Sequence, residues 1–171
     1  MIKSRYTRTL AFNHAVFAGW LAVCAWAPMS VRAITPDTAF TATQHSDDYP
    51  VLDARRLYAL GMIETGNDDR AVGALGEVSR YQLSPSVWRG YSKSTDYRNP
   101  EVSLQVARQH WNYLAAYFKE KTSRTPDDFD MYVMWNTRLG YYARRNFSQH
   151  QLAAVVQDRA QRFVNLINRK D

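Results

Sequence analysis

Residues 61–88 read GMIETGNDDRAVGALGEVSRYQLSPSVW and decide how this chain folds. Glu64 ends an apolar run, and residues 65–67, Thr-Gly-Asn, follow it at once. A polar loop containing two more glycines comes next, and Ser84-Pro85 then marks the start of another helix. The order predicts a single carboxylate between a helix and a polar loop, which suits a proton-transferring acid at the mouth of a cleft.

The residues before Glu64 favour a helix that ends just after it. Residues 51–64, VLDARRLYALGMIE, carry apolar side chains at a period of about 3.6. These apolar positions are Leu52, Leu57, Leu60 and Ile63, with Tyr58 and Ala59 beside them. Gly61 is unfavourable inside a helix, whereas Gly66 is a good position for the helix to stop. We therefore expect the carboxyl group of Glu64 at a helix C-terminus.

Further helix starts recur along the chain. The signals are Ser84-Pro85, Asn99-Pro100, Thr125-Pro126 followed by two acids, and Ser148, which with Gln151 resembles a capping box. The helix after Ser148 carries an apolar stripe formed by Leu152, Val155, Val156, Ala160, Phe163 and Ile167. No stretch alternates convincingly at a period of two. The sequence predicts a mainly α domain.

Residues 1–33 are interpreted as a secretory signal peptide. A basic beginning without acids is followed by an apolar run at residues 15–27 and by small or tolerated residues before position 34. The run is shorter than the roughly 20 residues that a membrane-spanning helix needs, so cleavage is favoured over an uncleaved anchor. A lipoprotein signal ending at Cys24 fits poorly, because Val23 stands where a small residue is expected. We expect export across the inner membrane, to the periplasm.

The remainder predicts a short tether at residues 34–49 and a single domain at residues 50–171. The signal peptide holds four bases and no acid, so without it 18 bases face 16 acids and the net charge falls from +6 to +2. Seven bases lie beyond residue 130, where we expect a solvated helix face rather than a surface for an acidic polymer or a membrane. Cys24 is the only cysteine. Without it the domain has no disulfide and must be stabilised by packing.

The stretch around Glu64 resembles the lysozyme-like superfamily, particularly the lytic transglycosylases and goose-type lysozymes. In that family the catalytic Glu is followed by Ser or Thr and then Gly, as in residues 64–66 here. The family's G-A-x-G element matches residues 73–76, and its following Gln and Pro match Gln82 and Pro85. A third element, an aromatic residue followed by Asn on a helix that faces the cleft, matches residues 135–136. The resemblance covers about residues 51–147 and is most specific at 60–88.

Two departures mark a divergent branch of that family. Residues 77–79, Glu-Val-Ser, lengthen the spacing between Gly76 and Gln82. Thr137-Arg138 replaces the Ala-Gly expected after Asn136. The resemblance nevertheless implies an α+β lysozyme-like fold, in which helices surround a substrate cleft and a small extended or β segment follows the catalytic helix. It also implies cleavage of peptidoglycan glycan strands.

Glu64 is the candidate catalytic residue. An acid that protonates a glycosidic oxygen near neutral pH needs a raised pKa, which an apolar surround and the negative end of a helix dipole both favour. The alternative for a lone Glu at a helix end is an exposed, solubilising carboxylate. The resemblance implies a place in the site for Thr65, Tyr81, Gln82, Trp135 and Asn136. Glu77 is a further candidate for substrate contact because it follows Gly76 in the cleft-wall segment, and Tyr141 because aromatic rings stack on sugars. Thr65 has the alternative of bonding its own helix, and Trp135 that of a core aromatic.

The reaction class depends on a second carboxylate. A hydrolase, either a muramidase or a chitinase-like enzyme, would use Glu77, Asp68 or Asp69 as nucleophile or to activate water. A lytic transglycosylase, by resemblance, uses one Glu as acid and then as base, and gives a 1,6-anhydro product. We expect Asp68-Asp69 to form a solvated turn, and Glu77 to order the loop through Arg80. A third hypothesis is a non-catalytic glycan-binding or secretion-apparatus scaffold.

Other chemistries lack the residues they need. The four histidines are scattered, and no metal-ligand spacing, phosphate-binding glycine loop or nucleophile elbow is present in the sequence. We expect no metal, no cofactor and no nucleic-acid partner. The expected partner is the peptidoglycan glycan strand, with cell-envelope or secretion-machine proteins as further candidates, and the expected state is a monomer.

Overall fold

The computed structural model describes residues 49–169. The helices in this range are α1 (Ala54–Thr65), α2 (Pro85–Tyr91), α3 (Pro100–Thr122), α4 (Asp128–Asn136), α5 (Leu139–Ala143) and α6 (Ala154–Asn168), with a 3-10 helix, η2 (Gln149–Gln151), before the last. Within residues 49–169 there is no strand, so the prediction of a mainly α domain is confirmed. The predicted signal peptide and all but the last residue of the tether lie outside the described residues. No helix in the described range has the length and apolar character to cross a membrane.

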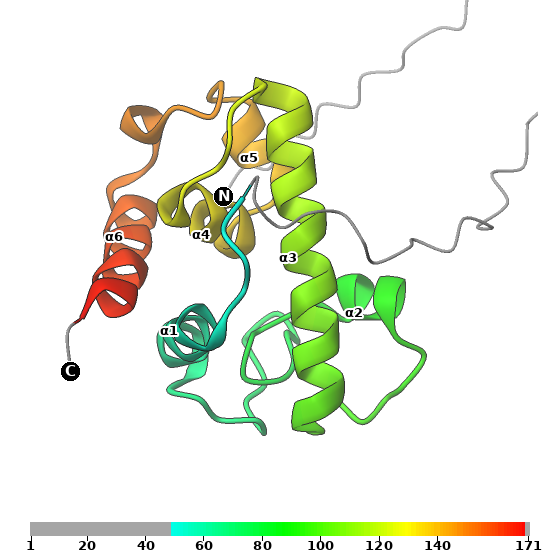
Figure 1. Cartoon of the computed structure of the whole chain (residues 1–171). Coiled ribbons are helices and arrows are strands. Elements are labelled where there is room, and N and C mark those ends of the chain that lie inside the picture. The colour runs from blue at the N-terminus through cyan, green and yellow to red at the C-terminus, as the bar shows by residue number, and fades with distance from the viewer. Residues whose placement is uncertain (1–48, 170–171) are drawn as a thin grey trace, which may run out of the picture. The chain divides into compact units, whose positions relative to one another are not determined.

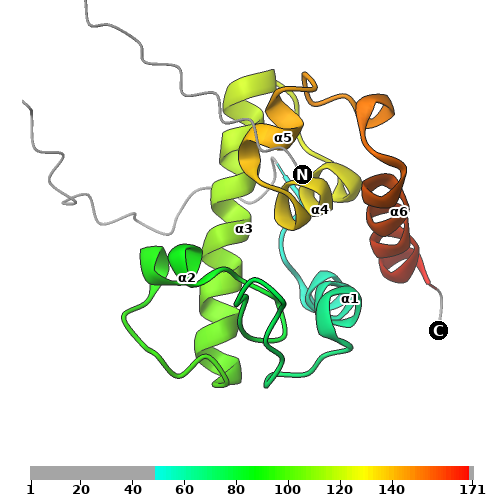
Figure 2. The ribbon, with the colours of Figure 1, turned by 180° about the vertical axis from the view of Figure 1, so that it is seen from behind.

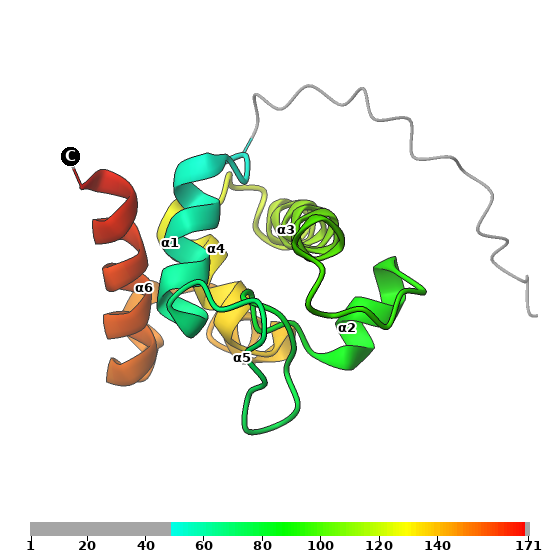
Figure 3. The ribbon, with the colours of Figure 1, turned by 90° about the horizontal axis from the view of Figure 1, so that it is seen from below.

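α3 is the longest helix, and the other helices are arranged around it (Figure 1). α2 packs on one side of α3 and α4 on another, while α6 packs on both α4 and α1. The view from behind shows α5 beside the upper half of α3 (Figure 2). Viewed along α3, α1 and α6 lie together on the side away from α2 (Figure 3). The core between these helices contains the fully buried rings of Trp88, Trp111, Tyr132, Tyr142, Phe118 and Phe163.

One predicted end of each of the first three helices is confirmed, namely the C-terminal end of α1 and the N-terminal ends of α2 and α3. α1 ends at Gly66, whose φ of 69° is the left-handed conformation that glycine adopts without strain. The Ser84 side chain accepts from the backbone N–H of Val87 and caps α2, and Asn99 caps α3 in the same way. Local capping chemistry was enough to predict these three positions.

Gly61 has a packing role that outweighs its cost inside α1. A Cβ atom at this position would lie 2.0 Å from the Oδ1 atom of Asn67. Asn67 also donates its backbone N–H to the carbonyl oxygen of Gly61 at 3.0 Å. The missing side chain therefore lets the loop after Glu64 fold back against the helix.

Two predicted helix starts are wrong. α4 begins at Asp128 rather than at Pro126, because Asp127 accepts from the backbone of Asp130 and forms a capping box with it. Ser148 makes no side-chain cap, and the last helix begins only at Ala154. The N–H group of Ala153 instead donates to the hydroxyl of Tyr141 at 3.0 Å. A side chain from another helix thus takes the place of the local cap.

Residues 66–84 form a loop without regular secondary structure. Its only bridges are isolated ones, from Val78 to Val72 and to Leu83. Both carboxylate oxygens of Asp69 accept hydrogen bonds from the guanidinium of Arg80, which lies across the loop. This pairing corrects the expectation that Glu77 would order the loop through Arg80, and it also corrects the expectation of a fully solvated turn at Asp69.

Candidate active site

The carboxyl group of Glu64 is buried at the end of α1. Its side chain is 7% exposed, and its Oε1 atom accepts from the hydroxyl of Tyr132 at 2.6 Å. Its Oε2 atom accepts from the guanidinium of Arg159 at 3.2 Å. The prediction of an acid at a helix end is confirmed, and the alternative of an exposed, solubilising carboxylate is wrong.

Burial raises the pKa of Glu64 above its ordinary value. The hydrogen bond from Tyr132, the charge of Arg159 and the polar side chain of Asn136 each act in the opposite direction, and the negative charge of Glu77 adds to the rise. The net result is a raised pKa, so Glu64 retains its proton more readily than an ordinary carboxylic acid does. This is the property that a general acid near neutral pH requires.

The sequence revealed neither Tyr132 nor Arg159 as a site residue. Arg159 lies on α6, and its Nε atom also donates to the hydroxyl of Tyr132 at 3.2 Å. Glu64, Tyr132 and Arg159 therefore form a closed triangle of hydrogen bonds from three helices. The bases beyond residue 130 were expected on a solvated face, and Arg159 departs from this because its side chain is only 35% exposed. No local pattern distinguishes Arg159 from the exposed Arg162 beside it.

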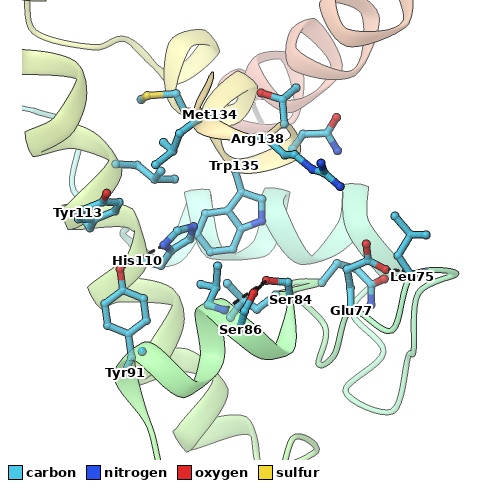
Figure 4. Close-up of a pocket in the computed structure, with 18 residues that line it drawn as sticks. Leu75, Glu77, Ser84, Ser86, Tyr91, His110, Tyr113, Met134, Trp135 and Arg138 are labelled. Carbon is cyan, nitrogen blue, oxygen red and sulfur yellow. Dashed lines mark hydrogen bonds between the residues drawn. The ribbon is translucent and has the colours of Figure 1, made fainter. Parts of the chain in front are cut away.

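A groove of about 960 Å³ lies next to this triangle, between α2, α3 and the C-terminal end of α4. Figure 4 shows Trp135 in its centre, with Tyr91, His110 and Tyr113 toward one end and Glu77 and Leu75 toward the other. Glu64 is not among the residues that line the groove. Asn136 is the groove residue nearest in role to Glu64, because it lines the groove and its side chain acts to lower the pKa of Glu64.

The aromatic end of the groove is held by contacts between the rings. His110 is 5.2 Å from Trp135 and 6.2 Å from Tyr113 between ring centroids, and its Nδ1 atom is 3.3 Å from the hydroxyl of Tyr91. Burial lowers the pKa of His110 to about 4, so the ring is neutral at physiological pH. The wall of the groove is therefore aromatic and uncharged at this end, a surface suited to the faces of sugar rings.

The predicted residues of the loop divide into groove residues and supporting ones. Gln82 lines the groove, and its amide donates to the carbonyl oxygen of Ser79 at 3.1 Å. Tyr81 is buried and uses its carbonyl oxygen to accept from the indole N–H of Trp135 at 3.1 Å. Thr65 bonds the carbonyl oxygens of Gly61 and Arg80, which is the alternative expected for a helix-end hydroxyl. Tyr81 and Thr65 thus orient the site rather than face the groove.

Glu77 lines the groove and is the best-placed second carboxylate. Its Oε2 atom accepts from the backbone N–H of Leu75 at 3.1 Å. A Cβ atom on Gly73 would lie 2.3 Å from this oxygen and 2.4 Å from the Oε1 atom of Gln82, so the glycine makes room for both side chains. Of the other two candidates, Asp69 is held by Arg80, whereas Asp68 is exposed and bonds the backbone of Arg70.

Tyr141 was predicted to contact substrate, and it is not among the residues that line the groove. Its hydroxyl caps α6, and the guanidinium of Arg145 lies 3.7 Å from the centroid of its ring. Arg138, which stands where the resemblance predicts a glycine, does line the groove. In the described part of the chain, no group of three or more His, Cys, Asp or Glu side chains is arranged to hold a metal ion.

No protein-family model matches the chain, and no curated protein or solved structure shows significant similarity to it. The functional conclusion therefore depends on the geometry of the site.

Proposed function

We propose that this protein is an exported peptidoglycan-cleaving enzyme with a lysozyme-like fold, and that it acts as a lytic transglycosylase. Glu64 is its single acid and base. The observation that carries the proposal is the buried Glu64 carboxyl with a raised pKa, beside a groove that is lined with aromatic rings and with Asn136, whose side chain acts on that pKa. The isolated bridges of residues 72–83 lie in the segment for which the resemblance implies an extended or β structure, which supports this part of the proposal.

In this mechanism Glu64 first donates its proton to the leaving glycosidic oxygen. The acetamido oxygen of the substrate bonds to the anomeric carbon as the glycosidic bond breaks. The Glu64 carboxylate then takes the proton of the muramyl 6-hydroxyl while the 6-oxygen bonds to the anomeric carbon and displaces the acetamido oxygen, which gives the 1,6-anhydro product. The same carboxyl group must therefore exist in both protonation states. Burial favours the protonated state, and the donors Tyr132 and Arg159 stabilise the carboxylate left after the first transfer.

Each oxygen of Glu64 accepts one hydrogen bond in this conformation and keeps a further lone-pair site, so either oxygen can carry the proton that is delivered. Arg159 is the donor that can move, because its bond is longer than that of Tyr132 and its side chain reaches solvent. Substrate that enters from the groove side displaces or reorients it in the proposed reaction.

The alternatives each have an observation in their favour. A hydrolase is supported by Glu77, the one acid that lines the groove. A non-catalytic glycan-binding scaffold is supported by the closed triangle around Glu64 and by its absence from the groove lining.

The deciding experiment incubates the purified protein with peptidoglycan and identifies the released muropeptides by mass spectrometry. The comparison includes Glu64→Gln and, as a matched control, Glu101→Gln at an exposed position on α3. Anhydro-muramyl products that disappear only in Glu64→Gln support the transglycosylase. Reducing-end products indicate the hydrolase, with Glu77→Gln as the next variant. No product from a folded protein on several peptidoglycans contradicts catalysis.

A further inference from the structure

A second hollow lies next to the groove, along helices α3 and α5. It has a volume of about 590 Å³ and lies where α3 and α5 end. Tyr113 of α3 and Leu139 of α5 line the groove, whereas Tyr117 and Ala143 line the second hollow. On each helix the second residue follows the first by four positions, which is about one turn on the same face. One turn along both walls therefore leads from the groove into the second hollow, which we name the α3–α5 pocket.

An aromatic row connects the two hollows. The rings of His110 and Tyr113 are stacked at 6.2 Å and 17°, and those of Tyr113 and Tyr117 at 6.4 Å and 29°. Tyr113 is 48% exposed, so part of the row faces solvent. From His110 to Lys121 the helix axis advances about 16 Å, enough for several sugar rings. Similarly oriented rings that are at least partly exposed offer stacking surfaces to an extended chain of sugars.

The α3–α5 pocket is basic. The two charged side chains that line it are the cations Lys121 and Arg124. Lys121 lies 5.7 Å from the centroid of the Tyr117 ring and pairs with Glu120 at 2.6 Å. Both partners of this pair are exposed, and solvent screening makes an exposed ion pair weak. The ammonium group can therefore exchange its partner for a carboxylate of a ligand.

We propose that the groove, the aromatic row and the α3–α5 pocket form one continuous binding track for a glycan strand whose sugars carry carboxylate-bearing peptide stems. The sugars stack along Tyr113 and Tyr117, and a stem carboxylate binds Lys121 and Arg124. The track deepens the proposed function and rests on it, because it places strand recognition beyond the bond that is cleaved. Its role is to hold a long strand in register with Glu64.

The test measures cosedimentation of the purified protein with insoluble peptidoglycan. All variants carry Glu64→Gln, so that the polymer stays intact. Tyr117→Ala is compared with Tyr117→Phe, which keeps the ring, and with Tyr58→Ala, a tyrosine 57% exposed on α1. Lys121→Glu is compared with Lys93→Glu, an exposed lysine outside both hollows. Each protein is measured on intact polymer and on chitin, a stem-free glycan of N-acetylglucosamine that carries no carboxylate, and thermal unfolding verifies the fold.

We expect Tyr117→Ala to weaken binding by about fivefold to tenfold, the usual size for a truncated aromatic contact, while Tyr117→Phe and Tyr58→Ala bind normally. Lys121→Glu should weaken binding to the intact polymer by a similar factor and leave binding to the stem-free glycan unchanged. Equal binding by Lys121→Glu and Lys93→Glu, or an effect of the same size on both polymers, overturns the track. If the parent protein releases muropeptides and the substitutions at Tyr117 and Lys121 do not change binding, the track is wrong and the proposed function stands. If binding depends on both residues and no muropeptide is released, only the proposed function is contradicted.

Discussion

Replacing Tyr132 with phenylalanine isolates the hydrogen bond that holds the carboxyl group of Glu64. The change removes one oxygen atom and keeps the ring, which is fully buried and stacked on Phe163 at 5.0 Å. The lost hydroxyl donates to Glu64 at 2.6 Å and accepts from Arg159 at 3.2 Å. Water cannot easily replace it, because the Glu64 side chain is 7% exposed.

The expected loss of stability depends on the charge of Glu64. A hydrogen bond to a charged group contributes about 1.5–3 kcal/mol and one between neutral groups about 1 kcal/mol. Tyr132→Phe should therefore lower the free energy of unfolding by about 2 kcal/mol where Glu64 is ionised and by about 1 kcal/mol where it is protonated. Since Tyr132 acts to lower the pKa of Glu64, its loss moves that pKa further upward. The folded variant then binds the proton more readily, so its stability deficit grows as pH rises.

The assay is urea unfolding from pH 4 to pH 8, together with muropeptide release. Tyr142→Phe is the matched control, because Tyr142 is also fully buried and donates to a buried carboxylate, that of Asp130, at 2.5 Å. Both variants should lose stability, but only Tyr132→Phe should slow muropeptide release, by about tenfold for each 1.4 kcal/mol lost in the transition state. A Tyr132→Phe deficit below about 0.5 kcal/mol, or one that does not change with pH, would refute the assignment of Tyr132 as the donor that stabilises ionised Glu64.

Three other predictions concern the same site. Glu64→Gln should abolish muropeptide release, and its stability relative to the parent should increase with pH. The parent loses stability as pH rises from the ordinary pKa of Glu64 through its raised folded value, which Gln does not; a constant difference in urea unfolding contradicts this. Asp69→Asn should cost about 1 kcal/mol, because the pair with Arg80 is half-buried, and hydrogen exchange should then be faster at residues 66–84. His110 should titrate with a pKa of about 4 by NMR, so the stability it contributes is lost as pH falls from its ordinary 6.5 to about 4; a midpoint near 6.5 would show a solvated ring.

Much of the site could be predicted because it lies on one short segment. Glu64 at the end of a helix, the stop at Gly66 and the cap at Ser84 depend on neighbouring residues, and the structure agrees with each. Gln82 and Glu77 reach the groove from that same segment. These features depend on interactions between residues close in the sequence, so the pattern of residue types is sufficient to predict them.

Other features depended on contacts between distant segments. Tyr132 and Arg159 meet Glu64 across 68 and 95 positions of the chain, and neither has a local signature. Tyr141 illustrates the same limit, since its aromatic ring favoured a place in the cleft and its hydroxyl instead caps α6.

Residue patterns along the chain were enough to predict the helical character, one capped end of each of the first three helices and an acid next to a polar loop. The burial of that acid, its hydrogen bonds from a tyrosine and an arginine, and the aromatic groove beside it emerged only from the packing of the helices. Capping and periodicity act over a few residues, whereas burial and the pKa shift it causes depend on which distant helices pack together.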